Sequence, residues 1–406
     1  MSKGPKVPPS SCTFLFVLFA LLSVVFQAAC AATAVQDPAP PPQPGNNSNY
    51  YVSPSGTDSS DGSQAAPWKT IQHAAGVVLP GDTVHVLPGT YGESPDLKTN
   101  ALSGSRILFV SDTKWAAKVT GDGASNWGFR IDGDYTTVEG FDITNVNPSG
   151  HEGVETEGNY DSVVGNNIHN ICPNGGHDGL GGAGIINGGD ITKGNLDVIG
   201  NVVHDVGDLT FPWYQVHGIY YGSEGGHIYN NIVYRTQGWG IHLWHAASNI
   251  TISNNTVFDN NQGGILVGAG DYPCPQCATD DYTIVTNNIV VYNLANNLDG
   301  STIGGFGIIE NGLTGTHNIY NNNLVYGNQA GSFSLQNGLI PGPSIAADPL
   351  FVNYQPDGNG DYHLQAGSPA IDAGTSQGPA PAYDFDGEPR PQGITWDIGA
   401  YEYHGT

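Results

Sequence analysis

Residues 238–268 read GWGIHLWHAASNITISNNTVFDNNQGGILVG, and in this stretch short apolar runs alternate with glycines and with paired asparagines. The runs GIHLW, TVF and GILV are too short for helices, and the Gly, Asn and Asp residues around them favour turns. They therefore predict short β-strands joined by turns. The same arrangement recurs along the chain, which indicates a structural repeat.

Two columns of residues appear when the copies of this repeat are aligned. Asparagines that precede an aliphatic run are separated by 35, 29, 24, 33 and 34 residues: Asn166, Asn201, Asn230, Asn254, Asn287 and Asn321. The second column consists of aliphatic residues that follow a glycine: Val154, Ile185, Ile219, Ile241, Ile265 and Ile308. We predict that the aliphatic column fills a core shared by stacked coils and that the asparagine amides stack from coil to coil.

The repeat predicts an all-β protein folded as a parallel β-solenoid. Each copy holds several short strands without a helical period between them, and the shortest coil has 22 to 24 residues. A β-propeller is the alternative, but its blades are longer and more evenly spaced. The extra residues of the longer coils are expected in loops, which often gather on the binding face of a solenoid.

Segments at both ends of the repeat are similar to segments of a known superfamily. Residues 67–78 (PWKTIQHAAGVV) are typical of a short amphipathic helix over an open first coil. Residues 348–353 (DPLFVN) and 397–403 (DIGAYEY) are typical of the C-terminal part of secreted bacterial β-helix proteins. Together with the repeat, they make residues 49–404 resemble the right-handed parallel β-helix proteins of the pectate-lyase-like superfamily.

This resemblance implies a division of the chain and a range of functions. A right-handed parallel β-helix with an N-terminal capping helix is expected over residues 49–345. Residues 346–406 are expected to form a capping segment at the C-terminal end of the β-helix. The superfamily contains lyases, hydrolases, epimerases and non-catalytic proteins, so the fold alone does not select an activity.

The first residues have the pattern of an export signal. Two lysines precede an apolar run at residues 14–26, and Ala-Thr-Ala at residues 32–34 provides a small-residue cleavage site. We expect residues 1–34 to be a cleaved signal peptide and residues 35–48 to be a Pro-rich linker. The mature protein is therefore expected to be secreted, and lipidation of Cys30 would instead anchor it to the cell envelope.

Acidic residues dominate the charge of the chain. Asp and Glu number 37 against 11 Lys and Arg, which gives a formal net charge of -26. Such a surface repels nucleic acids and anionic membranes, so both are excluded as partners. The N-terminal apolar run is shorter than a membrane span. We expect a monomer without a membrane span, whose partner is an extracellular polysaccharide.

Three cysteines remain after the expected cleavage. Cys274 and Cys277 lie in the sequence PCPQC, and no second pair with that spacing exists that would complete a structural zinc site. Because export permits disulfides, we predict a local disulfide between these two residues. Cys172 is then left unpaired or in exchange with that pair.

Outward positions of two neighbouring coils carry groups that suit catalysis. Side chains alternate between core and solvent along a strand, so if Ile219 and Ile241 point inward, Tyr220 and His242 point outward, about 4.8 Å apart. Glu155 holds the matching position two coils earlier. The predicted catalytic residues are His217, Tyr220, Arg235, His242 and Glu155, and the predicted substrate-binding residues are Trp213, Tyr221, Trp239, Trp244 and His245. Aromatic side chains offer flat apolar faces for sugar rings, so this patch predicts a saccharide groove.

The residues of this patch favour β-elimination on a uronate polysaccharide. That reaction needs a group that neutralises the carboxylate, a base for the C5 proton and an acid for the leaving oxygen. His217 or His242 would be the base or the neutralising group, Tyr220 the acid, and Arg235 a further candidate base. The Tyr/His pairing resembles that of alginate-type lyases and uronate epimerases. We therefore predict an extracellular polysaccharide lyase.

Two other functions remain open from the sequence. Hydrolysis of a neutral or weakly acidic glycan needs two carboxyl groups, for which Glu152, Glu155, Asp178 and Glu224 are candidates. A non-catalytic protein would bind a glycan in the same groove without cleaving it.

Acidic residues in the loops of the same coils suggest a cation. Carboxylate oxygens are the ligands that Ca²⁺ prefers. The candidate calcium ligands are Asp178, Asp190, Asp205 and Asp208. A calcium ion there would bridge a polyanionic substrate to an acidic protein.

Overall fold

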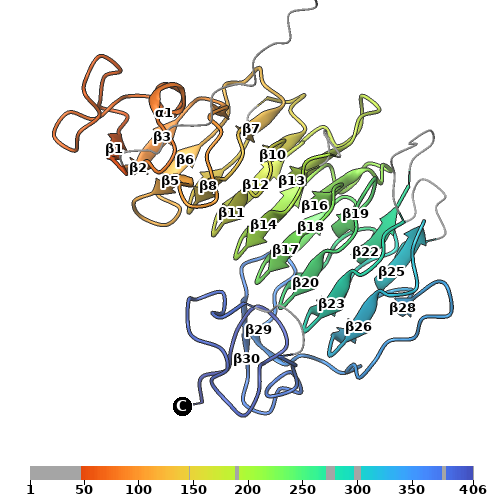
Figure 1. The fold of residues 1–406 in the computed structure, drawn as a ribbon. Helices are drawn as coiled ribbons and strands as arrows, with labels where there is room; N and C mark the ends of the chain where they lie inside the picture. The colour runs from red at the N-terminus through yellow and green to blue at the C-terminus, as the bar shows by residue number, and fades with distance from the viewer. Residues whose placement is uncertain are drawn as a thin grey trace, which may run out of the picture. The chain divides into compact units, whose positions relative to one another are not determined.

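The computed structural model describes residues 47–145, 147–187, 192–270, 279–296, 303–376 and 381–405. The predicted signal peptide, most of the predicted linker and the predicted Cys274–Cys277 disulfide lie outside these ranges. In the described residues, three parallel sheets each gain one strand per coil, so that the coils stack as a solenoid (Figure 1). The predicted all-β parallel β-helix is confirmed.

We name the three sheets I, II and III. Sheet I consists of β1 (Asn49–Val52), β2 (Thr83–Val86), β5 (Ile107–Ser111), β8 (Thr136–Glu139), β11 (Ser162–Val164), β14 (Leu196–Ile199), β17 (Gly226–Tyr229), β20 (Thr251–Ser253), β23 (Ile284–Thr286) and β26 (Ile319–Asn321). Sheet II consists of β4 (Asp96–Leu97), β7 (Trp127–Ile131), β10 (Glu152–Thr156), β13 (Gly182–Asn187), β16 (Val216–Tyr221), β19 (Trp239–Leu243), β22 (Gly263–Ala269), β25 (Phe306–Gly312) and β28 (Gly331–Ser334). Sheet III consists of β3 (Gly89–Tyr91), β6 (Ala117–Val119), β9 (Asp142–Ile143), β12 (Asn167–Ile171), β15 (Val202–Val206), β18 (Ile232–Thr236), β21 (Thr256–Phe258), β24 (Ile289–Val291) and β27 (Leu324–Tyr326).

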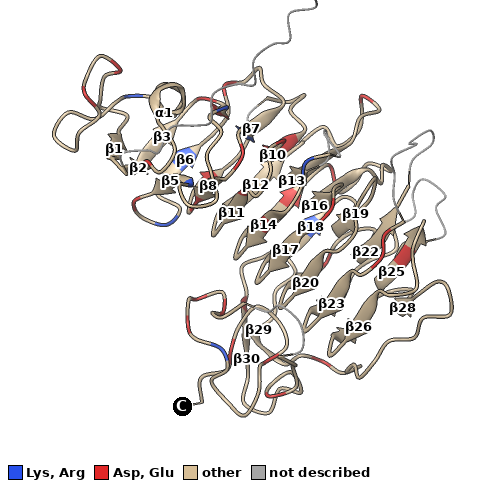
Figure 2. Ribbon diagram, in the orientation of Figure 1, with Lys and Arg blue, Asp and Glu red and all other residues tan. Residues whose placement is uncertain are grey.

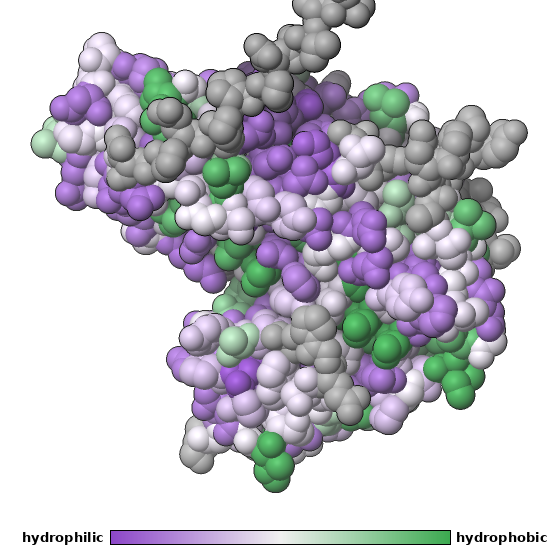
Figure 3. All heavy atoms as spheres, viewed as in Figure 1, coloured by the Kyte–Doolittle hydropathy of each residue, from purple (hydrophilic) through white to green (hydrophobic). Residues whose placement is uncertain are grey.

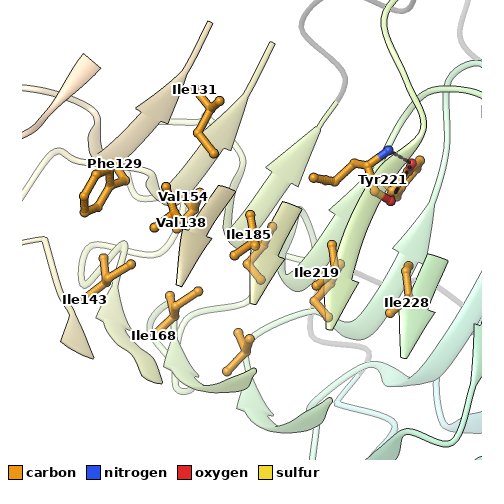
Figure 4. Packing of buried hydrophobic residues seen from close by; sticks show 14 of the residues in the cluster. Phe129, Ile131, Val138, Ile143, Val154, Ile168, Ile185, Ile219, Tyr221 and Ile228 are labelled. Carbon is orange, nitrogen blue, oxygen red and sulfur yellow. Dashed lines mark hydrogen bonds between the residues drawn. The ribbon is translucent and has the colours of Figure 1, made fainter. Parts of the chain in front are cut away.

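The aliphatic column of sheet II is confirmed. The strand register pairs its members from coil to coil, and all of them are fully buried: Val154, Ile185, Ile219, Ile241, Ile265 and Ile308. Figure 4 shows part of this column inside the solenoid, and the face drawn in Figure 3 is correspondingly mostly hydrophilic. The glycine before each member is needed for close packing. A Cβ on Gly218 would lie 2.5 Å from the carbonyl oxygen of Gly240 and 2.5 Å from a methyl group of Val233.

Truncating a member of this column should destabilise the whole stack. Ile241 is fully buried, so Ile241→Ala is expected to leave a cavity and to lower the free energy of unfolding by about 2–5 kcal/mol. Chemical unfolding followed by circular dichroism measures this difference. An unchanged unfolding midpoint would contradict the assignment of Ile241 to the core.

The asparagine column is correct in kind, and its predicted register holds for Asn166 and Asn201, but it is wrong by one residue in the next three coils and by two residues in the last. Hydrogen bonds join the buried amides from one coil to the next in this order: Asn166, Asn201, Asn231, Asn255, Asn288 and Asn323. The neighbouring residues Asn230, Asn254 and Asn287 instead have positive φ angles of 55°, 57° and 57°. Both members of each Asn pair therefore stabilise the turn, the second through its side-chain amide and the first through its left-handed backbone. Alignment of the sequence could not tell which member has which role.

The predicted capping helix is present as α1 (Ile71–Val77). Thr70 caps its N-terminus by accepting a hydrogen bond from the backbone N–H of His73. Ile71, Ala74 and Ala75 are buried against the first coils, near β1 and β4. Within the described ranges, no helix has the length and apolar character that crossing a membrane requires.

The C-terminal segment lies along the side of the solenoid, whereas the prediction placed it as a cap on the end. Its antiparallel strands β29 (Phe351–Asn353) and β30 (Asp361–Leu364) share a hydrophobic cluster with the outward side chains of sheet III, among them Tyr234 and Phe258. The buried Arg390 donates to Glu402 Oε1 at 2.5 Å and to Asn230 Oδ1 at 3.1 Å. Aromatic and aliphatic residues on the outer face of sheet III are covered in this way, which the strand pattern alone could not reveal.

Candidate functional site

A cleft of about 740 Å³ lies over sheet II, across β10, β13, β16, β19, β22 and β25. The residues that line it include Glu152, Ile186, Tyr214, Gln215, His217, Tyr220, Trp239, His242, Trp244, His245, Gln262, Leu266, Ile303 and Asn311. Six residues predicted as site residues from the sequence therefore surround one cavity. Tyr214, Gln215, Gln262 and Asn311 were missed, because they lie in loops or on strands whose aliphatic pattern gave no polar signal.

The core packing of β16 explains why two functional side chains lie on the same face. Gly218 and Ile219 both face the core, so the residues on either side of them, His217 and Tyr220, face outward. Their rings are stacked with centroids 5.4 Å apart and planes 12° apart. The strand register then places His242 directly beside Tyr220 in the next coil, as predicted.

Tyr220 forms a hydrogen-bonded pair with His245. The Tyr220 hydroxyl lies 2.7 Å from His245 Nε2, and the two rings meet edge to face. His245 reaches this position because β19 ends at Leu243 and the backbone of His245 adopts a positive φ of 53°. The residue predicted as a substrate contact therefore lies where a proton can pass between its imidazole and the phenol. Such a pair is suited to proton transfer.

A chain of hydrogen bonds determines the protonation of the other two histidines. The backbone N–H of Trp239 donates to His217 Nδ1 at 3.2 Å, so this nitrogen carries no proton. His217 Nε2–H then donates to His242 Nδ1, 2.8 Å away. It follows that neutral His242 carries its proton on Nε2.

Burial keeps both imidazoles neutral. It lowers the pKa of His217 to about 3 and lowers the pKa of His242, which the neighbouring His217 and His245 lower further. The prediction of His217 as a base or neutralising group does not fit this arrangement, because both of its ring nitrogens are already engaged. His217 instead orients His242, which lines the cleft as a hydrogen-bond donor.

Glu152 brings a protonated carboxyl group to the cleft. Its Oε2 atom is buried and has no hydrogen-bond partner among the described groups. Burial, assisted by the nearby charge of Glu155, raises the pKa of Glu152 to about 8, against the opposing effect of Arg130. At neutral pH this residue is therefore a neutral acid that can donate a hydrogen bond.

Glu155 holds the register position that the sequence predicts but does not line the cleft. It pairs with Ile186, and Ile186 pairs with Tyr220, so Glu155 lies two coils away from the Tyr220–His245 pair. Its Oε2 atom lies 3.5 Å from Arg130 Nη1. Burial raises the pKa of Glu155, and Arg130 opposes that shift. A catalytic role for Glu155 stays a prediction without a contact to the cleft.

The predicted aromatic contacts divide into three groups. Trp239 is buried and packs with Leu266 and Ile309, and the partly buried Trp244 packs against the same cluster, so both help to form the cleft. Trp213 packs instead against the main core.

The prediction of Tyr221 as a substrate-binding residue is wrong. Because Ile219 points inward, Tyr221 two residues later also points inward, and its hydroxyl accepts the Leu196 N–H at 2.8 Å inside the solenoid (Figure 4).

The prediction of Arg235 as a base in this site is also wrong. Arg235 belongs to β18 of sheet III, a strand with a blue segment in Figure 2, whereas the cleft lies on sheet II. Its Nε atom lies 2.6 Å from Asp205 Oδ1. Arg235 and His242 are close in sequence but lie on different sheets, because each coil passes through all three sheets.

The predicted calcium ligands do not form one cluster in the described residues. Asp178 lies 3.2 Å from His151 and Asp208 lies 3.1 Å from His177, whereas Asp205 pairs with Arg235 on sheet III. Asp190 is outside the described residues. In the part of the chain that the structure describes, no group of three or more His, Cys, Asp or Glu side chains could hold a metal ion. Calcium binding stays a prediction.

Family models match two parts of the chain. Residues 50–197 match the model of the Pel9A-like right-handed β-helix region, and residues 245–378 match a model described as disaggregatase related. The uncharacterized protein YwoF of Bacillus subtilis (strain 168) is 32% identical over 82 residues, which are 20% of this chain and 18% of that protein. The match thus spans about a fifth of the length of that curated relative.

Solved structures show the same architecture. Pectate lyase Pel9A superposes with a TM-score of 0.56 at 18% identity, over 88% of this chain and 96% of that chain. XylC in its complex with xylose superposes with a TM-score of 0.50 at 14% identity, over 74% of this chain and 70% of that chain. The chain has the right-handed parallel β-helix fold, and its predicted resemblance to the pectate-lyase-like proteins is confirmed. That fold is shared with pectate lyase Pel9A and with XylC.

Proposed function

We propose that this protein is a secreted polysaccharide lyase that cleaves a uronate-containing glycan by β-elimination in the cleft on sheet II. The proposal is carried by the Tyr220–His245 hydrogen bond of 2.7 Å, which joins a proton donor to a proton acceptor at the wall of the cleft. The reaction needs such a pair, because one proton leaves C5 and another must reach the leaving oxygen.

The pair allows a proton cycle that closes without an external reagent. The Tyr220 hydroxyl passes its proton to His245 Nε2, the Tyr220 oxygen takes the C5 proton, and the C5–H electrons form the double bond between C4 and C5. The bond from C4 to its oxygen breaks, and the Tyr220 hydroxyl gives its proton to that oxygen. The proton on His245 then returns to the Tyr220 oxygen across their hydrogen bond, which restores both groups.

The uronate carboxylate needs stabilisation as the C5 proton leaves. None of the described residues that line the cleft is Lys or Arg. The available donors are His242 Nε2–H, the protonated carboxyl of Glu152 and the side-chain amides of Gln215 and Asn311. Neutral donors that are held in place and directed at a developing charge stabilise it effectively. Of the two neutralising groups that the sequence suggested, His242 belongs to this set and His217 acts through it.

Product analysis on a panel of acidic and neutral polysaccharides tests the proposal. Ultraviolet absorbance of unsaturated uronates and new reducing ends are recorded together, with Ca²⁺ and with a chelator. We expect both signals to rise together on a uronate polymer, and the chelator arm tests the predicted calcium requirement. Reducing ends without absorbance would indicate hydrolysis, and binding without either signal would indicate a non-catalytic glycan-binding protein. Each of these two results overturns the proposal.

The protonated state of Glu152 predicts an alkaline limit of activity. Because its pKa is raised to about 8, the carboxyl donates a hydrogen bond below that pH and becomes a carboxylate that repels the substrate above it. We expect kcat/KM on a uronate polymer to fall as the pH rises through about 8. Glu152→Gln keeps a donor that does not titrate, so its profile should stay flat over the same range.

The matched control for this pH profile is Glu155→Gln. Glu155 does not line the cleft, so this variant should keep the alkaline fall. The fall should move to a slightly lower pH, because the charge of Glu155 helps to raise the pKa of Glu152. An alkaline fall that persists unchanged in Glu152→Gln would contradict the role of this carboxyl.

A further inference from the structure

The turn that precedes each strand of sheet I presents a row of equivalent residues along the solenoid. The strand registers align one residue per coil: Tyr135, Tyr160, Asn195, Gly225, Asn249, Tyr282 and His317. The first six share a positive φ between 55° and 75°, so they occupy the same turn conformation. We call this set the turn row.

Both ends of the turn row carry stacked aromatic rings. Tyr135 and Tyr160 stack with centroids 4.8 Å apart and planes 10° apart. Tyr282 and His317 stack at 4.5 Å and 4°. Because each pair stacks along the direction of the coils, the second faces of Tyr160 and Tyr282 are turned toward the middle of the row. These two side chains are 45% and 56% exposed.

The middle of the row has no large side chain. Its residues are Asn195, Gly225 and Asn249, and a Cβ at Gly225 would lie 2.4 Å from Asn195 Oδ1. Tyr160 and Tyr282 are four coils apart, which corresponds to about 19 Å at a strand spacing of about 4.8 Å. A cavity of about 590 Å³ lies in this interval, lined by the three residues of the row and by their neighbours. This recess thus lies between Tyr160 and Tyr282 along the row, although neither tyrosine is among the residues that line it.

The charged groups around this recess are engaged with neighbouring groups, and carboxylates are in excess. Lys193 Nζ lies 3.2 Å from Asp134, and His227 Nδ1 lies 2.7 Å from Asp197. Asn249 donates to Glu224 Oε1 at 2.8 Å. The recess therefore offers hydrogen-bond donors and acceptors without an excess of positive charge that would select an anion.

We propose that the turn row is a second glycan-binding site, which takes uncharged saccharide units between Tyr160 and Tyr282. The hydroxyl groups of such units match the amide, imidazole and carboxylate groups of the recess, and their apolar faces match the two exposed rings. No described residue lines both this recess and the cleft on sheet II. The site binds glycan whether or not the cleft cleaves it, so this inference goes beyond the proposed lyase activity.

The double variant Tyr160→Ala/Tyr282→Ala tests this site. Its affinity for neutral xylan and glucomannan, and for alginate as a charged comparison, is measured by affinity electrophoresis and calorimetry. We expect binding of at least one neutral polymer to weaken about 10-fold or more, which corresponds to a loss of about 1.4 kcal/mol or more. Thermal melts of the variant confirm that the fold is kept.

The matched control is Tyr326→Ala/Tyr383→Ala, which removes two tyrosines that are 38% and 58% exposed away from the turn row. This variant should bind as the wild type does. Equal losses in both double variants, an unchanged affinity in Tyr160→Ala/Tyr282→Ala, or a wild type that binds neither neutral polymer would each overturn the inference. Turnover of a short uronate oligosaccharide should be unchanged in the turn-row variant. A further result is possible, in which neither the wild type nor the turn-row variant cleaves any substrate, but the turn-row variant alone loses affinity for the neutral polymer. In that case the inference stands and the lyase proposal fails.

Discussion

Tyr220→Phe should reduce turnover of a uronate polymer by about 10²–10⁴-fold, the usual contribution of a positioned acid or base. The substitution removes the hydroxyl that lies 2.7 Å from His245 Nε2, so the C5 proton has no acceptor and the leaving oxygen has no proton donor. The ring remains, and with it the stacking on His217 at 5.4 Å. Initial rates of unsaturated-product formation measure the loss, and circular dichroism reports whether the fold is retained.

His245→Gln and the double variant separate a shared proton cycle from two independent effects. If the two residues act as a unit, Tyr220→Phe/His245→Gln should lose little more than either single variant. Tyr214→Phe is the matched control, since Tyr214 also lines the cleft but is 40% exposed and contacts neither His242 nor His245 through any described hydrogen bond. Wild-type turnover in Tyr220→Phe would exclude the pair as the acid/base group.

Arg390→Met should lower the free energy of unfolding by about 3–5 kcal/mol, as expected when one partner of a buried ion pair is removed. The side chains of Arg390 and Glu402 are both fully buried, and the guanidinium also donates to the carbonyl oxygens of Gly399 and Ala400 at 2.9 and 2.8 Å. Without Arg390, Glu402 keeps a buried charge, and the link to Asn230 of the solenoid is lost. Urea unfolding followed by tryptophan fluorescence measures the difference.

Two further variants identify the cause of that loss of stability. Arg390→Met/Glu402→Met removes both charges, so it should recover much of the stability that the single variant loses. Lys98→Met breaks an ion pair with Asp96 in which the lysine side chain is 69% exposed, and it should leave the unfolding midpoint unchanged. Equal midpoints for Arg390→Met and the wild type would show that the C-terminal segment does not depend on this ion pair.

The cleft and the turn row assign different tasks to two sides of one solenoid. The cleft on sheet II holds the hydrogen-bonded pair Tyr220 and His245, and the turn row beside sheet I holds aromatic and polar groups without such a pair. A polymer held at the turn row would have a higher effective concentration at the cleft. The two proposals fail separately, because each has variants that do not touch the other site.

The sequence by itself determined the features that follow from local period. The recurrence of Gly-aliphatic and Asn-Asn units predicts stacked coils, and alternation along a strand places Ile219 in the core and Tyr220 and His242 outside. The same alternation also implies that Tyr221 points inward, so its assignment to the substrate was an error that the sequence could have prevented.

Only the tertiary structure decided the contacts that depend on turns and on coil length. His245 reaches Tyr220 through a positive φ after β19, and Arg235 belongs to another sheet because a coil of 22 to 24 residues passes through three sheets. The recess between Tyr160 and Tyr282 depends on a register that spans four coils of unequal length. The alternation of side chains along a strand depends only on neighbouring residues, so it can be predicted from the sequence. Turn conformations and loop lengths vary from coil to coil, so these side chains come into contact only when the coils stack.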